Sequence, residues 1–445
     1  MKDKAFAPVT ILSSVIVLLY LLSFTDLTVF KWLPLNQVDI LSDVRANKIK
    51  EIKQPLIAVD IVKKIGTHLL PSDNTLIADY GIDSNNALLY FFDKLDKLKQ
   101  GNGKIRLAYF GDSFIEGDYV TDELRVKLQV TYGGNGLGFI PVQSIVEGEY
   151  KYLNFKSNHS WKDDNFVNRS NSKFLGLTGH VFYANGTAST SYSLKKDKAI
   201  GLVKFYSGKS NAKVPVLSVT TDKVSKNISL NNNALINETI INQIPIHSLK
   251  IATAESGLPV YGISMEDSTG IYVDNYGFRG NTGVLTNKIS AEVMKSFNTY
   301  FKYDLIIVHY GLNAIVHGQH KFTWFSNSQN ILIQKLKQSF PNVPILVIST
   351  SDLGYKQGGE WITEPAVPYM VNTQRVIAQT NKVAFWDLYT SIGGENTIVS
   401  WAEQTPKLAD MDYMHLNILG AKKVSEVFYN KLVASKNYYQ SNSLK

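Results

Sequence analysis

The chain has 445 residues, 44% of them hydrophobic, and this length and composition allow more than one domain and exclude a disordered or collagen-like chain. The net charge of +8 favours an acidic partner such as a polysaccharide or a membrane surface, while the lack of Lys/Arg runs and of aromatic RNA-binding motifs speaks against nucleic acid. The absence of cysteine excludes disulfides, thiol nucleophiles and cysteine-ligated zinc.

Residues 1–25 are typical of a transmembrane signal anchor. The stretch FAPVTILSSVIVLLYLLSF carries no charge and is long enough to cross a bilayer as a helix. Lys2 and Lys4 precede it and Asp26 follows it, which predicts a cytoplasmic N-terminus. A cleaved signal peptide is the alternative, although no small-x-small cleavage site follows the apolar run. Either way, the rest of the chain is expected beyond a bacterial inner membrane, in the periplasm or outside the cell.

The next part of the chain has an α/β pattern. ALLYFFDKLDKLKQ predicts a helix ended by the glycines that follow, and IRLAYFG, residues 105–111, predicts a buried strand. From about residue 290 the pattern returns, with strands expected in YDLIIVHYG, VPILVIST and VAFWDLY and helices between them. We therefore expect residues 26–150 and 275–445 to form one α/β domain.

Residues 151–274 interrupt this pattern. They contain short alternating runs such as HVFYANG, GLVKFYSGK and VPVLSVTT, separated by clusters of Gly, Asn, Ser and Lys. Such spacing predicts an all-β sandwich inserted into the α/β domain.

A candidate nucleophile lies where the strand 105–111 ends. Gly-Asp-Ser places Ser113 at the C-terminal edge of the expected sheet, where open α/β folds have their active sites. A serine hydroxyl needs a base and an acid that orients the base. His415 and Asp412, three residues apart in DMDYMHLN, could both come from one loop. Alternatively, these residues form an ordinary turn before the last helix.

Two further segments could stabilise an oxyanion. Asn313, in HYGLNAI, follows an apolar strand, so its amide is expected at the same edge of the sheet as Ser113. Gly280, in NYGFRGNTG, lies where the β-rich block returns to the α/β domain, and a glycine there permits close approach of a backbone N–H to substrate. Both segments are also compatible with ordinary loops.

Taken in this order, the four segments resemble the four blocks of the SGNH (GDSL-type) hydrolase superfamily. The resemblance implies a flavodoxin-like three-layer α/β/α fold. It makes Ser113 the nucleophile, His415 the base and Asp412 its orienting acid. It also makes the Ser113 N–H, the Gly280 N–H and the Asn313 side chain the oxyanion donors.

The segment GDSFIEGDYVTDELRVKLQVTYGGNGLGFIPV is similar to the first block of bacterial peptidoglycan O-acetylesterases. In that group a β-sandwich resembling a carbohydrate-binding module is inserted between the first and second blocks, as expected here. Phe114 and Asn281 depart from the pattern of the group, and either could alter the pocket or the preferred acceptor.

The resemblance implies an esterase that removes O-acetyl groups from an acetylated cell-wall or extracellular glycan through an acetyl-serine. An O-acetyltransferase would share this intermediate and could receive acetyl groups from a membrane-bound acyl donor protein. No cofactor and no metal is implied.

A different class of function is a non-catalytic, surface-anchored glycan-binding protein. Tyr183, Phe205 and Tyr206 of the β-rich block could stack on sugar rings, although alternating aromatics usually belong to a core. His317 and His320 could hold a metal, but two histidines without a nearby carboxylate in the sequence more often form a polar loop.

Overall fold

The computed structural model describes residues 71–443, except 72, 74, 82–86, 102, 145–149, 151, 169–173, 196–198 and 212. The transmembrane segment predicted for residues 1–25 lies outside this part of the chain. Among the described helices, none combines the length and the apolar character needed to cross a bilayer.

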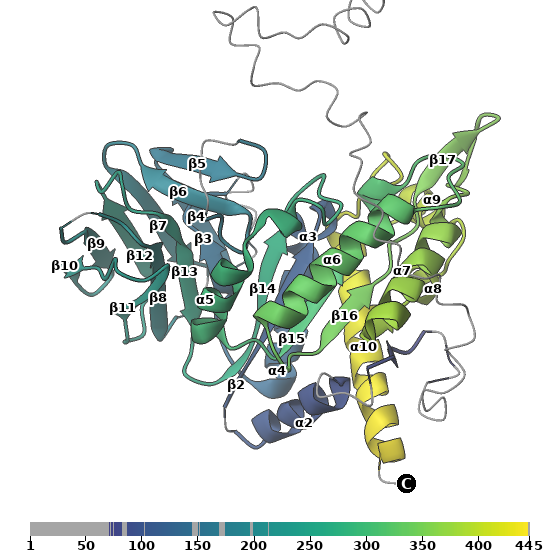
Figure 1. The fold of residues 1–445 in the computed structure, drawn as a ribbon, viewed down its shortest axis with the longest axis horizontal. Helices are drawn as coiled ribbons and strands as arrows, with labels where there is room; N and C mark the ends of the chain where they lie inside the picture. The colour runs from purple at the N-terminus through teal and green to yellow at the C-terminus, as the bar shows by residue number, and fades with distance from the viewer. Residues whose placement is uncertain are drawn as a thin grey trace, which may run out of the picture. The chain divides into compact units, whose positions relative to one another are not determined.

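A six-stranded sheet forms the centre of the α/β domain (Figure 1). Five of its strands are parallel, and in chain order they lie 2-1-3-4-5 across the sheet, the order of flavodoxin-like folds. A short antiparallel strand completes one edge. In spatial order the strands are β1 (Ala78–Asp79), β19 (Ala384–Trp386), β16 (Ile345–Ile348), β15 (Leu305–His309), β2 (Lys104–Gly111) and β14 (Gly270–Gly277).

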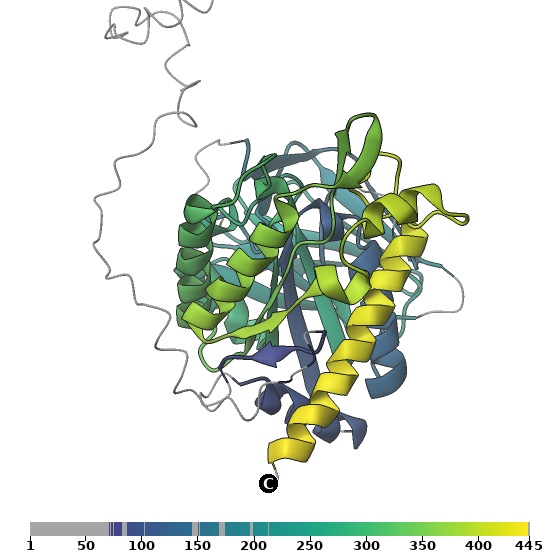
Figure 2. The same ribbon diagram turned by 90° about the vertical axis from the view of Figure 1, so that its right-hand side faces the viewer.

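Helices cover both faces of this sheet, because its strands are apolar on both sides. In β2, Ala108 and Phe110 pack against one helical layer, and Leu107 and Tyr109 pack against the other. The first layer contains α5 (Ala291–Phe301), α6 (Thr323–Ser339) and α7 (Val367–Asn381). The second contains α2 (Leu88–Lys99), α4 (Tyr119–Tyr132), α8 (Leu388–Ile392), α9 (Thr397–Glu403) and α10 (Ile418–Ser443), the long yellow helix of Figure 2.

The β-rich block forms two antiparallel sheets around a core of their own. One sheet contains β10 (Ser225–Ser229), β9 (Val216–Thr221), β12 (Ser248–Thr253), β7 (Ala188–Leu194) and β4 (Leu153–Ser157). The other contains β11 (Ile236–Asn242), β8 (Leu202–Gly208), β13 (Val260–Glu266), β6 (His180–Ala184) and β5 (Trp161–Asn165), and β3 (Gly138–Pro141) pairs with β13.

The limits of the insertion differ from those predicted. The predicted range, 151–274, begins after β3, which already belongs to the sandwich, and ends inside β14, which belongs to the central sheet. The pattern of polar and apolar residues in β14 does not distinguish it from the sandwich strands. Its parallel pairing with β2 is what assigns it to the α/β domain.

The sandwich is attached to the α/β domain by buried contacts. Arg106 on β2 donates hydrogen bonds to Asp274 on β14 and to Glu266 on β13, both at 2.5 Å, and all three side chains are almost completely buried. Tyr206 on β8 packs edge-on against Phe301 of α5, with ring centroids 4.7 Å apart. These contacts hold the two domains together on the side of β14.

Candidate active site

Ser113 lies directly beyond the C-terminal end of β2, at the first position of the short helix α3 (Ser113–Glu116). Asp112 caps this helix, and its carboxylate accepts a hydrogen bond of 3.0 Å from the backbone N–H of Phe114. The strands β14 and β15 lie on opposite sides of β2, so the strand order reverses at β2 and Ser113 is at the switch point. Ligands of open α/β folds bind at such a point.

The structure brings the three predicted catalytic side chains together. Ser113 Oγ is 3.2 Å from His415 Nε2, and His415 Nδ1 is 2.6 Å from Asp412 Oδ2. When the imidazole donates its Nδ1–H to Asp412, its Nε2 is left to accept the serine proton. This is the arrangement that activates a serine as a nucleophile.

The loop between α9 and α10 carries both the histidine and the aspartate. Asp412 Oδ1 accepts hydrogen bonds of 3.0 Å from the backbone N–H groups of Met414 and His415. Burial raises the pKa of Asp412, but the hydrogen bonds from His415 and Met414 and the charge of His415 together outweigh burial and hold the pKa below its usual value. Asp412 is therefore ionised when it faces the imidazole.

Asn313 and Gly280 line the same open cleft as Ser113, and the volume of this cleft is about 740 Å³. One hydrogen of the Asn313 amide is donated to Asp112 Oδ2 at 2.9 Å, which leaves the second hydrogen for a ligand. Gly280 has φ +70°, and a Cβ there would meet nothing within 4 Å. Within the described residues, its backbone N–H has no acceptor.

Sequence reasoning missed the partner of Asn313. Asp112 is 2% exposed, and burial raises its pKa to about 6, even though the Phe114 N–H, the Asn313 amide and the charge of His415 lower it. The pattern Gly-Asp-Ser indicates a turn before the serine, but only the pairing of β2 with β15 places Asp112 beside Asn313.

Sequence analysis assigned no role to Glu116, which forms an ion pair at the edge of the cleft. Its carboxylate accepts hydrogen bonds from the Arg279 backbone N–H at 3.1 Å and from the Arg279 side chain at 2.6 Å. The pair thus ties the segment after Ser113 to the residue before Gly280.

The two departures from the esterase pattern have different surroundings. Phe114 lines the cleft and packs edge-on against the buried His309, with ring centroids 4.8 Å apart. Asn281 is buried, and its side chain bonds to Thr286 and to the backbone N–H of Gly283. Phe114 therefore shapes the cleft surface, whereas Asn281 shapes the loop that follows Gly280.

The residues considered for stacking on sugars and for binding a metal lie outside this cleft. Phe205 and Tyr206 are fully buried, so the suggestion that they stack on sugars is wrong for both; Phe205 belongs to the sandwich core and Tyr206 to its contact with α5. His317 bonds to Glu364 at 2.9 Å, a carboxylate that the sequence places 47 residues away. The described residues contain no group of three side chains that could hold a metal.

No family model and no curated protein sequence matches this chain. Among solved structures, one described as "Peptidoglycan O-acetylesterase in action" has a TM-score of 0.68 and 21% identity, and the match covers 81% of this chain and 99% of that one. A family two carbohydrate esterase from Cellvibrio japonicus has a TM-score of 0.28 and 9% identity, with 64% and 99% of the two chains covered. The YxiM protein of Bacillus subtilis has a TM-score of 0.30 and 12% identity, with 63% and 90% covered.

Because the match to the peptidoglycan O-acetylesterase covers 81% of this chain, it extends beyond the α/β domain into the inserted β region. The described part of the chain thus shares its fold with a structure described as a peptidoglycan O-acetylesterase, and its central sheet has the flavodoxin-like strand order that the resemblance implied.

Proposed function

We propose that the protein is a serine esterase that removes O-acetyl groups from a cell-envelope glycan such as peptidoglycan. The observation that carries the proposal is the hydrogen-bonded series Ser113–His415–Asp412 at the end of β2, open to a cleft that also exposes two candidate oxyanion donors. The fold shared with a structure named as a peptidoglycan O-acetylesterase supports the choice of substrate.

In the proposed mechanism, His415 Nε2 takes the proton of Ser113 Oγ as the oxygen attacks the acetyl carbonyl carbon. The carbonyl oxygen becomes an oxyanion and accepts hydrogen bonds from the Ser113 N–H, the Gly280 N–H and the Asn313 amide. The bond from the acetyl carbon to the sugar oxygen then breaks, and the sugar oxygen takes the proton from His415. An acetyl-serine remains.

Water completes the reaction in the proposed esterase. His415 removes a proton from water, the water oxygen attacks the acetyl carbon, and Ser113 leaves with the proton returned by His415. The His415 side chain is 41% exposed, which supports access of water to this step. In a transferase, a sugar hydroxyl would replace the water.

We further propose that the protein works outside the cytoplasm, anchored by residues 5–25. Support comes from the charge-free segment and the lysines before it. Membrane fractionation, together with protease accessibility of the α/β domain in intact spheroplasts, tests this location; a domain protected from protease until lysis contradicts it.

The enzymatic proposal is tested by acetate release from p-nitrophenyl acetate and from O-acetylated peptidoglycan, with and without a chitooligosaccharide acceptor. The full chain is compared with Ser113→Ala and with His247→Ala, a control because His247 pairs with Asp222 in the sandwich outside the catalytic cleft. Release lost only in Ser113→Ala supports the esterase. Transfer that outpaces release supports the transferase, and turnover independent of Ser113 contradicts both.

A further inference from the structure

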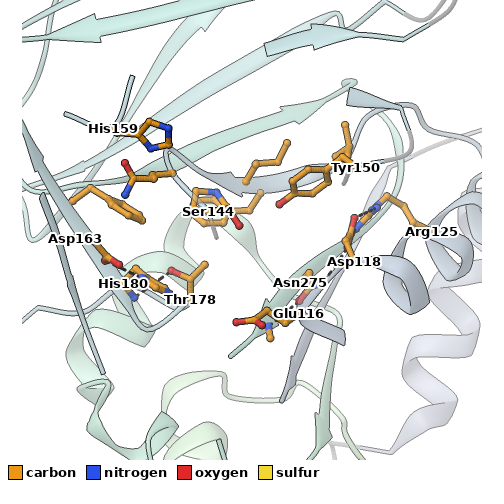
Figure 3. Close-up of a pocket in the computed structure, with 17 residues that line it drawn as sticks. Glu116, Asp118, Arg125, Ser144, Tyr150, His159, Asp163, Thr178, His180 and Asn275 are labelled. Atoms are coloured by element: carbon orange, nitrogen blue, oxygen red, sulfur yellow. Dashed lines mark hydrogen bonds and ion pairs between the residues drawn. The ribbon is translucent and has the colours of Figure 1, made fainter. Parts of the chain in front are cut away.

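A second cleft lies where the sandwich meets the α/β domain (Figure 3). It measures about 400 Å³, within the range of known ligand pockets. We call it the junction cleft; its polar lining includes Glu116, Gln143, Tyr150, Asp163, Thr178 and His180.

The lining has the mixed chemistry that binds sugars. Beside these polar side chains, the partly exposed Pro141 and the ring of the partly exposed Tyr150 supply apolar surface. Sugar rings carry hydroxyl groups on their edges and C–H groups on their faces, and an acetamido group adds both a methyl group and an amide. Polar groups that fix orientation over an apolar floor suit such a ligand.

His180 supplies a directed hydrogen-bonding group. Its Nδ1 is 2.9 Å from Asp163 Oδ1, and its ring stacks on Phe182 with an interplanar angle of 2°. The ring is therefore held in one orientation by both contacts. Within the described residues its Nε2 has no hydrogen-bond partner, so this nitrogen remains for a ligand in the cleft.

The junction cleft adjoins the catalytic cleft. Glu116 lines both of them. On the junction side its backbone packs closely on Gly277, where an added Cβ would lie 2.7 Å from the Glu116 Cα. On the catalytic side its carboxylate binds Arg279. The two clefts therefore meet at Glu116.

The chain segment after β14 passes from one cleft to the other. Gly277 lines the junction cleft, the ring of Phe278 packs against His180 with centroids 5.3 Å apart, and Gly280 lines the catalytic cleft. Phe278, which contacts His180, is therefore only two residues along the chain from Gly280, a candidate oxyanion donor.

We propose that the junction cleft binds N-acetylated sugar residues of the same glycan strand whose O-acetyl group is presented to Ser113. This assignment rests on the proposed function for its choice of substrate. The strand crosses over Glu116, so the cleft holds sugars next to the reacting one and gives the enzyme a preference for polymer over isolated esters.

The test measures binding of chitohexaose, a hexamer of N-acetylglucosamine without O-acetyl esters, to the full chain by isothermal titration calorimetry. His180→Asn keeps an amide near the position of Nδ1 beside Asp163 but removes the ring Nε2, and it is expected to weaken binding about tenfold, the effect of one hydrogen bond. His247→Asn is the matched control, since that histidine pairs with Asp222 on the other sheet of the sandwich. Its binding constant is expected to equal that of the unchanged chain.

His159→Asn is a second variant, because His159 also lines the cleft and asparagine tolerates its φ of +56°. Thermal unfolding shows whether each variant is folded. No binding of chitohexaose to the unchanged chain, or equal binding by both folded cleft variants, overturns the assignment. Hydrolysis of p-nitrophenyl acetate by the unchanged chain reports separately on the proposed function, so the two failures are distinguishable.

Discussion

The side-chain amide of Asn313 donates a hydrogen bond of 2.9 Å to Asp112, the residue before the candidate nucleophile. Asp112 follows β2 and Asn313 follows β15, and these strands are neighbours at the switch point of the sheet. The contact therefore links the position of one oxyanion donor to the turn that carries Ser113.

Replacing Asp112 with asparagine is expected to lower kcat about 10- to 100-fold with little change in KM. The two carboxylate oxygens accept from the Phe114 N–H and from Asn313, and an asparagine amide would present a donor to one of them. A misplaced oxyanion donor weakens binding of the transition state more than of the substrate. Steady-state kinetics with p-nitrophenyl acetate measures kcat and KM separately. A loss confined to KM would contradict the positioning role.

The carboxyl group of Asp112 also makes the free energy of unfolding depend on pH. Burial raises the pKa of Asp112 from 3.8 to about 6, so the folded chain holds this proton more tightly than the unfolded chain does. The resulting stabilisation is complete below about pH 4 and is lost as pH rises through 6, a change of about 3 kcal/mol. Urea unfolding from pH 4 to 7 should show this decline relative to Asp112→Asn. If the free energy of unfolding changed with pH in the same way for the unchanged chain and for Asp112→Asn, the prediction would be wrong.

Asp412→Asn is expected to reduce kcat by about 10²- to 10⁴-fold, because an amide can stabilise the wrong tautomer of His415 and cannot balance the imidazolium charge. The fold should be unaffected, since the Asp412 side chain is 49% exposed. Kinetics and thermal unfolding of the variant provide the check. Activity within twofold of the unchanged chain would show that Asp412 does not orient the base.

Arg106→Met is expected to reduce the free energy of unfolding by about 3–5 kcal/mol, because it leaves Asp274 and Glu266 as buried charges without their shared partner. Lys162→Met is the matched control. The Lys162 side chain is 61% exposed and lies 3.7 Å from Asp164, so its loss should cost within about 0.5 kcal/mol. Urea unfolding at pH 7 measures both. If both substitutions lowered the free energy of unfolding equally, the buried cluster around Arg106 would stabilise the fold no more than a surface ion pair does.

Local sequence patterns identified much of the fold and the order of the catalytic segments. The apolar run 105–111 and the Gly-Asp-Ser after it correspond to β2 and the start of α3, and the apolar residues 305–308 correspond to β15. These predictions hold because an apolar run of strand length and the turn residues that end it are local features of the sequence. The limits of the insertion were wrong because the assignment of β3 and β14 to their sheets depends on distant pairing partners.

The sequence by itself determined which residues can do the chemistry: a serine after a buried strand, and a histidine and an aspartate on one loop. Only the tertiary structure decided that these groups meet, across 302 residues between Ser113 and His415. It also decided that Asn313 donates a hydrogen bond to Asp112 and that Glu116 lines two clefts. The physical reason is that such contacts follow from strand order and domain packing, which depend on the free energy of burying the whole core rather than on any short segment.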